Sequence, residues 1–236
     1  MILLAIETAT LDVAAALVDD GETLAAFTRR GTRRHIETLH PGIDELFAAT
    51  GRAPSDLAAV AVDRGPGLFT GLRVGIAAAK GFAAALELPI VGLSSMEILR
   101  VAAARRGYAS AVPVIDMRRG EVAWSLVDGE IVLGTPEELA AALAAREEPG
   151  ATPLVLVGDG AARHRELLCS LLGSDGGSLL IAPDELLAPP VEILGAIACE
   201  RVADGEFEDA FALAPEYLRE ADARANFATR EGVVVK

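Results

Sequence analysis

The chain has 236 residues, of which 52% are hydrophobic and 24% charged, and its formal net charge is −14 at pH 7. This length allows a sizeable core in one large domain or two lobes. The acidic balance predicts a poor stand-alone binder of nucleic acid, because neutralising phosphates needs clustered Lys and Arg. Two cysteines outside any C-x-x-C pattern indicate a reduced, cytoplasmic protein, and no apolar run reaches the roughly 18 residues that a membrane span needs.

The first half of the chain predicts a β-hairpin unit followed by alternating helices and strands. Apolar runs bounded by turn residues indicate strands, and segments with apolar residues at a spacing of three and four indicate helices. The expected strands are residues 2–6, 13–18, 23–27, 57–62 and 90–92, and the expected helices are residues 35–49, 70–86 and 96–105.

The second half repeats this arrangement, beginning with residues 111–133, AVPVIDMRRGEVAWSLVDGEIVL. When Ile115 is aligned with Ile6, Asp116 falls on Glu7 and Val122 on Val13, with one residue fewer at the second turn. Two unrelated hairpins could also resemble each other to this extent. The later segments predict helices at residues 137–146, 161–172 and 191–203 and strands at residues 154–157 and 179–181.

Two halves that each begin with a hairpin point to a duplicated α/β fold. We expect an N-terminal lobe of residues 1–107 and a C-terminal lobe of residues 108–223. Residues 224–236 show little periodicity and are predicted to be a disordered tail.

The stretch DRGPGLFTGLRVG, residues 63–75, joins a predicted strand to a predicted helix. It does not match the P-loop, and it departs from the dinucleotide fingerprint because Thr70 stands at the third glycine position. One interpretation is an anion-binding helix start capped by Thr70, with Gly65, Gly67 and Arg73 beside it. The favoured interpretation is close packing, because small residues recur every four positions along the helix, at Gly71, Gly75, Ala79 and Ala83.

Several stretches carry a resemblance to a known family: ILLAIETAT, HIETLHPGIDEL, GPGLFTGLRVG, PIVGLSSMEIL, IDMRRGEV and APEYLREADA. Together they cover most of residues 1–223 and resemble the TsaB (YeaZ) family of tRNA threonylcarbamoyladenosine biosynthesis. The resemblance implies a duplicated actin-like, Hsp70-like fold (ASKHA, RNase H-like), with a hairpin-led mixed sheet flanked by helices in each lobe. It also implies a non-catalytic subunit that scaffolds and activates the paralogous transferase TsaD with the ATPase TsaE, and that meets tRNA only through this complex.

The catalytic branch of this family carries a metal-binding stretch His-Leu-Glu-Gly-His, in which two histidines four positions apart on a helix face one ion. The aligned stretch here is SMEIL, so Ser95 and Leu99 stand at the two ligand positions. Neither side chain replaces an imidazole for a transition metal. We therefore expect no metal, no catalytic residue and no resident cofactor, with ATP used by the assembled complex, and we interpret the chain as a pseudoenzyme.

In actin-like ATPases the first hairpin turn binds phosphate, and an acid there helps to hold the metal ion. Glu7, Thr8 and Thr10 occupy this turn, and Asp116 takes the equivalent place in the second half. These residues are either a vestigial nucleotide site or ordinary polar residues at strand ends. A competing interpretation is an actin-like ATPase or small-molecule kinase with a complete nucleotide site, and another is a metallopeptidase.

Two surfaces are candidates for partner contacts. Arg118 and Arg119 are either solvated charges in a turn or a docking surface for TsaE or RNA. The helices expected at residues 35–49 and 70–86 are the predicted surface for TsaD, or for a second copy of this chain in a homodimer. The alternative is that these apolar faces pack on their own sheet. The residues assigned to this surface are Ile36, Leu39, Ile43, Leu46, Phe47, Gly71, Leu72, Gly75 and Ala79.

Overall fold

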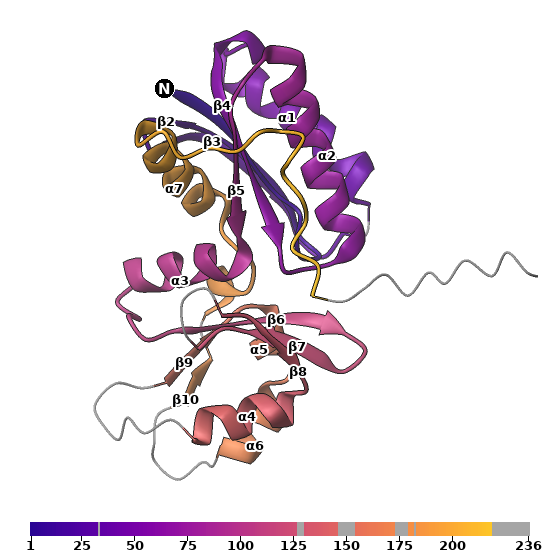
Figure 1. The fold of residues 1–236 in the computed structure, drawn as a ribbon, viewed down its shortest axis with the longest axis vertical. Helices are drawn as coiled ribbons and strands as arrows, with labels where there is room; N and C mark the ends of the chain where they lie inside the picture. The colour runs from indigo at the N-terminus through magenta and orange to yellow at the C-terminus, as the bar shows by residue number, and fades with distance from the viewer. Residues whose placement is uncertain (33, 127–129, 146–153, 173–178, 182, 219–236) are drawn as a thin grey trace, which may run out of the picture.

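Two five-stranded mixed sheets, one in each lobe, form the framework of the molecule (Figure 1). The computed structural model describes residues 1–32, 34–126, 130–145, 154–172, 179–181 and 183–218. The first sheet has the order β3-β2-β1-β4-β5 and contains β1 (Ile2–Glu7), β2 (Val13–Asp19), β3 (Glu22–Arg29), β4 (Leu57–Gly65) and β5 (Ile90–Ser94). The second has the order β10-β9-β6-β7-β8 and contains β6 (Val112–Arg118), β7 (Glu121–Trp124), β8 (Val132–Gly134), β9 (Leu154–Val157) and β10 (Leu179–Ile181).

The two sheets have the same topology when each is read from its hairpin side. In both, the central strand pairs antiparallel with the strand that follows it and parallel with a later strand on its other edge. The predicted duplication is therefore confirmed, with one correction to the alignment. Glu7 lies opposite Ala14, whereas Asp116 lies opposite Val122. Val122 thus corresponds to Ala14 and not to Val13, because the second copy lacks a residue in its first turn.

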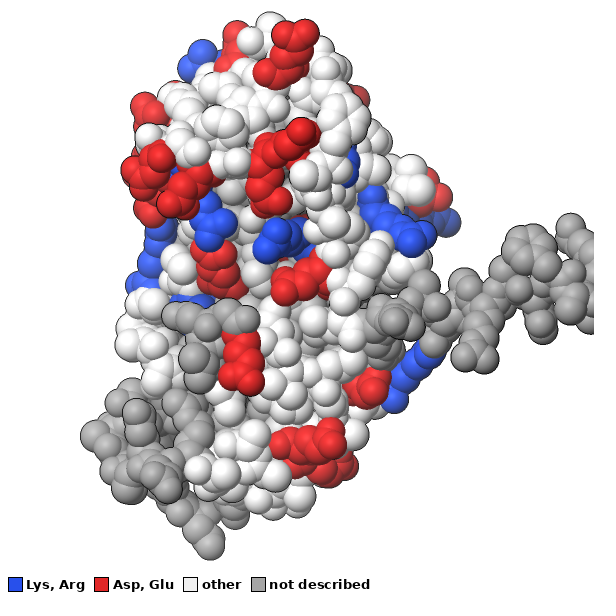
Figure 2. Space-filling model, in the orientation of Figure 1, with Lys and Arg blue, Asp and Glu red and all other residues white. Residues whose placement is uncertain are grey.

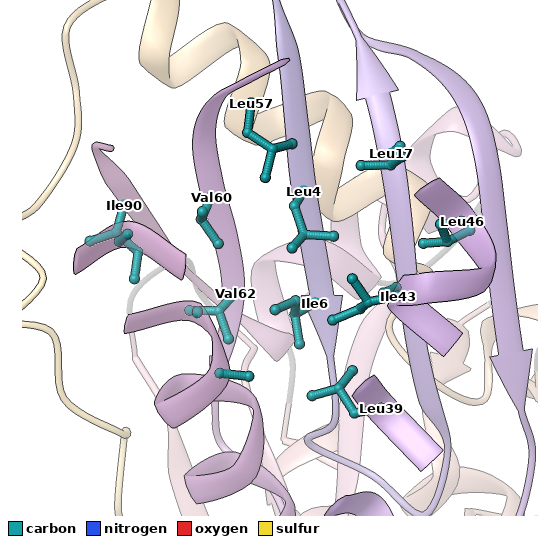
Figure 3. Close-up of a cluster of buried hydrophobic side chains, with 14 of the residues drawn as sticks. Leu4, Ile6, Leu17, Leu39, Ile43, Leu46, Leu57, Val60, Val62 and Ile90 are labelled. Carbon is teal, nitrogen blue, oxygen red and sulfur yellow. The ribbon is translucent and has the colours of Figure 1, made fainter. Parts of the chain in front are cut away.

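Helices cover both faces of the first sheet, which explains why its central strand β1 is buried along its whole length. α1 (His35–Thr50) and α2 (Phe69–Leu86) pack on one face, where Leu4 and Ile6 of β1 meet Leu39 of α1 (Figure 3). α7 (Val191–Ala203) covers the other face, where Leu3 of β1 packs in a core with Leu194. Successive residues of β1 therefore serve two separate cores, because side chains alternate along a strand.

α3 (Ser95–Arg105) lies between the two sheets, and its apolar residues are divided between the cores of both lobes (Figure 1). The second sheet is covered by α4 (Pro136–Ala144), α5 (Asp159–Arg163) and α6 (Arg165–Leu172). The single helix expected at residues 161–172 is thus two helices. α5 packs on β6, whereas α6 packs on α4 and β10, so the chain changes direction between them. Two 3-10 turns, η1 (Pro54–Asp56) and η2 (Asp184–Leu186), complete the described elements.

The C-terminal part of the described chain returns to the first lobe along residues 206–218, called the strap below. The N–H of Glu208 donates to the carbonyl oxygen of Ile90 at 2.8 Å, and the N–H of Glu216 donates to the carbonyl oxygen of Arg64 at 2.7 Å. Between these contacts Leu213 is 1% exposed and belongs to the core under α1 and α2.

The strap and α7 correct the predicted division into lobes. Residues 108–223 were expected to form the C-terminal lobe, yet α7 and residues 206–218 pack on the first sheet. The chain crosses between the lobes twice, because the second face of the first sheet is covered by a helix that comes late in the sequence. The tail predicted at residues 224–236 lies outside the described residues.

Among the described helices, α2 is the one whose length and composition would suit a membrane crossing, with a mean hydropathy of 1.2 over 18 residues. From the sequence, residues 70–86 were expected to be a helix but not a segment long and apolar enough to span a membrane. A core helix of an α/β domain passes the same test, and α2 buries Leu72, Ile76 and Ala79 in the first lobe.

Candidate partner interface and polar clusters

A groove of about 810 Å³ runs along α1 and α2. Its surface consists mainly of apolar and small side chains, among which Ile36 is 65% exposed and Phe69 is 45% exposed. A contiguous exposed apolar surface is typical of a protein–protein contact. The groove is lined by Ile36, His40, Phe69, Thr70, Arg73, Val74, Ala77, Ala78, Gly81, Phe82 and Ala85.

Of the nine residues predicted for the partner surface, Ile36 lines this groove and the other eight do not. The structure corrects their assignment, because they are buried under the helices, as Figure 3 shows for Leu39, Ile43 and Leu46. The face of each helix that carries the bulkier apolar residues packs on the sheet. The sequence had left this packing open as the alternative to a partner surface. The eight buried residues are Leu39, Ile43, Leu46, Phe47, Gly71, Leu72, Gly75 and Ala79.

The glycines before and within α2 mark places where backbones approach closely. A Cβ atom added at Gly71 would collide with the carbonyl oxygen of Thr8, one at Gly75 with the Thr8 hydroxyl, and one at Gly67 with the carbonyl oxygen of Ala9. The Thr8 hydroxyl in turn donates to the carbonyl oxygen of Gly71 at 2.9 Å. The packing interpretation of the small-residue ridge is therefore confirmed: the glycines seat α2 on the turn between β1 and β2.

Thr70, predicted as the helix cap, does not cap α2. The helix begins at Phe69, and Leu68 stands in the capping position without a side-chain hydrogen bond. The N–H of Leu68 donates to Ala9 at 2.6 Å, and the N–H of Gly65 donates to a nearby carboxylate at 2.7 Å. These two internal bonds use N–H groups of the loop before α2, and Thr70 itself lines the groove.

Arg73, predicted beside the glycine loop, takes part in a stacked cluster at the start of α2, called the rim trio (Phe69, Arg73 and Tyr217). The Arg73 guanidinium carbon lies 3.7 Å above the centre of the Phe69 ring. Its Nε–H donates to the hydroxyl oxygen of Tyr217 at 2.9 Å, and the two ring centres are 5.2 Å apart. The sequence analysis missed Tyr217, because no local pattern in the strap indicates contact with a residue 144 positions earlier.

Two buried carboxyl groups lie beside each other: Glu7 at the end of β1 and Asp63 on β4. They are 1% and 0% exposed. Burial is the main cause that raises the pKa of each, and the negative charge of Asp63 raises the pKa of Glu7 further. Oε1 of Glu7 accepts from the N–H of Ala9 at 2.8 Å, whereas its buried Oε2 has no donor among the described residues. The fold therefore favours the protonated form of Glu7, because burial and the neighbouring Asp63 both disfavour its negative charge.

Ser95, the first residue of α3, connects this acid pair to the helix between the lobes. Its hydroxyl oxygen lies 2.7 Å and 2.8 Å from the two carboxylate oxygens of Asp63 and 2.9 Å from the carbonyl oxygen of Pro66. Leu99, at the second aligned ligand position, is fully buried in an apolar core. Within the described part of the chain, no group of three or more His, Cys, Asp or Glu side chains gathers into a metal site.

The residues predicted as a vestigial nucleotide site are engaged in internal contacts. Thr8 is held by α2 as described above. The Thr10 hydroxyl oxygen accepts from the N–H of Asp12 at 3.2 Å, and its carbonyl oxygen accepts from Nε2 of His35 at 3.0 Å. Glu7 borders an interlobe cleft of about 420 Å³ whose lining carries both acidic and basic side chains. Figure 2 shows Lys and Arg side chains around the middle of one face, with Asp and Glu beside them as well as above and below.

Asp116, the counterpart of Glu7, holds the turn between β6 and β7. Its carboxylate accepts from the N–H of Arg118 at 3.0 Å and from Nη1 of the same residue at 2.8 Å, and Nε of Arg163 lies 3.4 Å away. Arg118 and Arg119 both have left-handed backbones, with φ of 62° and 57°. Asp159, whose contact with Asp116 was not expected from the sequence, accepts from the N–H of Asp116 at 2.9 Å, and burial raises its pKa to about 6. Asp116 is therefore paired with arginines.

Comparison with known proteins connects this geometry to one family. Residues 27–137 match the family model of TsaD, tRNA N6-adenosine threonylcarbamoyltransferase. The chain is 34% identical over 226 residues to the tRNA threonylcarbamoyladenosine biosynthesis protein TsaB of Escherichia coli (strain K12), covering 93% of this chain and 95% of the relative. It is 29% identical over 234 residues to the Bacillus subtilis (strain 168) protein of the same name, covering 96% and 98%.

Solved structures agree with these relatives. YeaZ from Pseudomonas aeruginosa has a TM-score of 0.74 at 29% identity, covering 92% of this chain and 99% of that chain. An activator of 2-hydroxyisocaproyl-CoA dehydratase from Clostridium difficile, with bound ADPNP, has a TM-score of 0.51 at 9% identity over 87% and 97% of the two chains, a likeness of fold alone. The predicted actin-like (ASKHA) fold class is confirmed. From its full-length similarity, the chain belongs to the TsaB (YeaZ) family of tRNA threonylcarbamoyladenosine biosynthesis proteins.

Proposed function

We propose that this chain is a non-catalytic subunit of the tRNA threonylcarbamoyladenosine complex, and that it holds and activates a TsaD-type transferase. The observation that carries this proposal is the exposed apolar groove on α1 and α2, which lie within the range matched by the transferase family model. The transferase should therefore carry a corresponding helix pair. Two related surfaces can pair about an approximate two-fold axis, as identical subunits commonly do. A second copy of this chain would compete for the same groove.

The exposed side of α2 suits a closely packed partner helix. Ala77, Gly81 and Ala85 recur every four residues along the groove, and a Cβ atom added at Gly81 would meet nothing within 4 Å. A partner helix can approach this stripe closely while it covers Ile36 and Phe69, the two large exposed apolar side chains of the groove. Burying such side chains in a packed seam is the usual source of affinity at an interface.

The proposal of a non-catalytic role rests on which groups occupy the positions of the catalytic branch. Ser95 offers a hydroxyl already directed at Asp63, and Leu99 offers no ligand atom. Asp116 is neutralised by Arg118 and Arg163, which supports a remnant of a nucleotide site over a working one. Catalysis and ATP turnover then belong to other subunits of the complex.

The remaining partners follow from charge and backbone conformation. We assign the docking of a TsaE-type ATPase to the turn at Arg118 and Arg119, because consecutive non-glycine residues in left-handed conformations often mark functional turns. tRNA is reached through the complex, since a chain of net charge −14 attracts phosphate poorly by itself. The place of action is the cytoplasm, where bacterial tRNA is modified.

Reconstitution tests the proposed function. TsaD, TsaE, the synthase that makes the threonylcarbamoyl adenylate, ATP, threonine, bicarbonate and tRNA are combined with and without this chain, and modified nucleosides are measured by mass spectrometry. We expect modification to depend on this chain and this chain alone to modify nothing. Full modification without it would overturn the proposal. Micromolar binding of Mg-ATP to the isolated chain, measured by calorimetry, would favour an actin-like ATPase or kinase instead.

A further inference from the structure

The rim trio joins the partner groove to the C-terminal strap. Phe69 and Arg73 line the groove, whereas Tyr217 comes from the strap, which reaches this point because Leu213 is anchored in the first core. The Tyr217 hydroxyl accepts from Nε–H of Arg73. A residue outside the groove thus determines how a groove residue is held.

The contacts of Arg73 restrict its side chain and leave its outer amino groups available. The guanidinium lies flat on the Phe69 ring, and one edge is occupied by Tyr217. No other hydrogen bond or ion pair of Arg73 is found among the residues that the structure describes. An exposed arginine normally loses about 2 kcal/mol of rotamer entropy when a partner orders it. Here Phe69 and Tyr217 already order the Arg73 side chain before a partner binds. The planar guanidinium then presents paired N–H donors that suit a carboxylate.

The charge of the groove differs from that of the whole chain. Asp and Glu outnumber Lys and Arg by 35 to 21 in the sequence, yet among the described residues no Asp or Glu lines the groove. Its polar lining consists of Arg73, His40 and Thr70. An apolar groove with a cationic end and no acid is complementary to a helix that carries an acidic residue beside its apolar stripe.

We propose that Tyr217 is a positioning residue that holds Arg73 across Phe69, so that Arg73 binds a carboxylate of the helix docked in the groove. This inference rests on the proposed function, in which that helix belongs to the transferase-type partner. The strap is then part of the interface, although Tyr217 itself acts through Arg73. The apolar groove supplies most of the affinity, and the arginine at its end determines orientation and partner choice.

The experiment measures the affinity between this chain and the TsaD-type partner by calorimetry at several salt concentrations, without RNA. Tyr217→Phe keeps the ring and removes the hydroxyl, and we expect it to weaken the complex by about threefold to tenfold. Arg73→Met keeps an unbranched chain over Phe69 and removes the donors, and we expect a larger loss and a weaker dependence of affinity on salt. Tyr108→Phe, in the connection between the lobes, and Arg105→Met, on α3, are the matched controls and should bind as the wild type does.

A double substitution separates positioning from a merely structural role. Because Tyr217 acts through Arg73, adding Tyr217→Phe to Arg73→Met should cause no further loss. Unchanged affinity of both single variants would overturn the inference while leaving the proposed function standing. A wild-type chain that forms no complex would instead overturn the proposed function. If Arg73 met an RNA phosphate, the two variants would lower only tRNA retention by the assembled complex, which would also overturn the inference.

Discussion

The hydroxyl oxygen of Ser95 lies 2.7 Å from Oδ1 and 2.8 Å from Oδ2 of Asp63, and all three atoms are buried. Ser95 begins α3, the helix between the lobes, and Asp63 lies on β4 of the first sheet. This contact therefore ties the interlobe helix to the first lobe. Ser95 therefore serves as a hydrogen-bond donor to a structural carboxylate.

Replacing Ser95 by alanine should destabilise the fold. The substitution removes a buried hydrogen bond to a charged group, and we expect the free energy of unfolding to fall by about 1.5–3 kcal/mol. Urea denaturation of the wild type and the variant measures the difference. Ser55→Ala, at an exposed position in η1, should stay within about 0.5 kcal/mol of the wild type. An equally small change for Ser95→Ala would mean that the hydroxyl contributes nothing to the acid pair.

The acid pair predicts that stability depends on pH in a particular direction. The fold raises the pKa of Glu7 above its ordinary value of 4.5, so folding favours the protonated form. The stabilising contribution is complete below the pKa of the unfolded chain and is lost as pH rises through the folded pKa. Glu7→Gln imitates the protonated group and places no negative charge beside Asp63. Thermal unfolding between pH 4.5 and 9 should therefore show the variant gaining stability relative to the wild type as pH rises.

The charged groups near the pair define the controls for this pH series. Asp63 has a raised pKa from burial, as does Glu216 of the strap, which lies near Arg64 and accepts a hydrogen bond from Ser94. Glu22→Gln, at an exposed position on β3, changes the same residue type away from the pair. Its stability should follow the wild type at every pH. Parallel profiles for Glu7→Gln and the wild type would contradict the raised pKa of Glu7.

A charge in the groove should break the partner contact without unfolding the chain. Ala77 is exposed within the groove, and Ala84 is exposed on the same helix outside it. We expect Ala77→Glu to weaken binding of the TsaD-type partner by at least about tenfold, because an unpaired charge would be buried at the interface. Ala84→Glu should bind normally. Gel filtration and calorimetry of the mixtures check both, and equal binding by the two variants would place the interface elsewhere.

Two glycines of α2 should respond in opposite ways to the same substitution. Gly71→Ala drives a Cβ atom into the backbone carbonyl of Thr8, which can move only with the β1–β2 turn, so we expect a loss of about 1–3 kcal/mol. Gly81→Ala meets nothing within 4 Å and lies in the helix interior, so a gain of about 0.5–1 kcal/mol is expected. Chemical denaturation measures both. A loss at Gly81 comparable to that at Gly71 would contradict the packing described for this helix.

The local helices and strands and the internal repeat could be predicted from the sequence. Which face of each helix packs on the sheet could not. α1 begins at His35 as predicted and ends at Thr50, one residue later than expected. Its apolar residues occur on more than one side, so spacing alone did not separate Ile36, which is exposed, from Leu39 and Ile43, which are buried. The face that packs on the sheet depends on how its side chains fit against β1 and β2. The sequence of one helix alone does not contain this information.

The sequence by itself determined the duplicated hairpin-led units, the small-residue ridge of α2 and the absence of two histidines four positions apart, because these depend on residue type and short-range spacing. Only the tertiary structure decided that α7 covers the first sheet, that Glu7 and Asp63 share a buried site, and that Tyr217 holds Arg73. Each of these contacts joins residues far apart in the chain. Their partners are selected by burial and geometry once the whole chain has folded, and no local pattern records that choice.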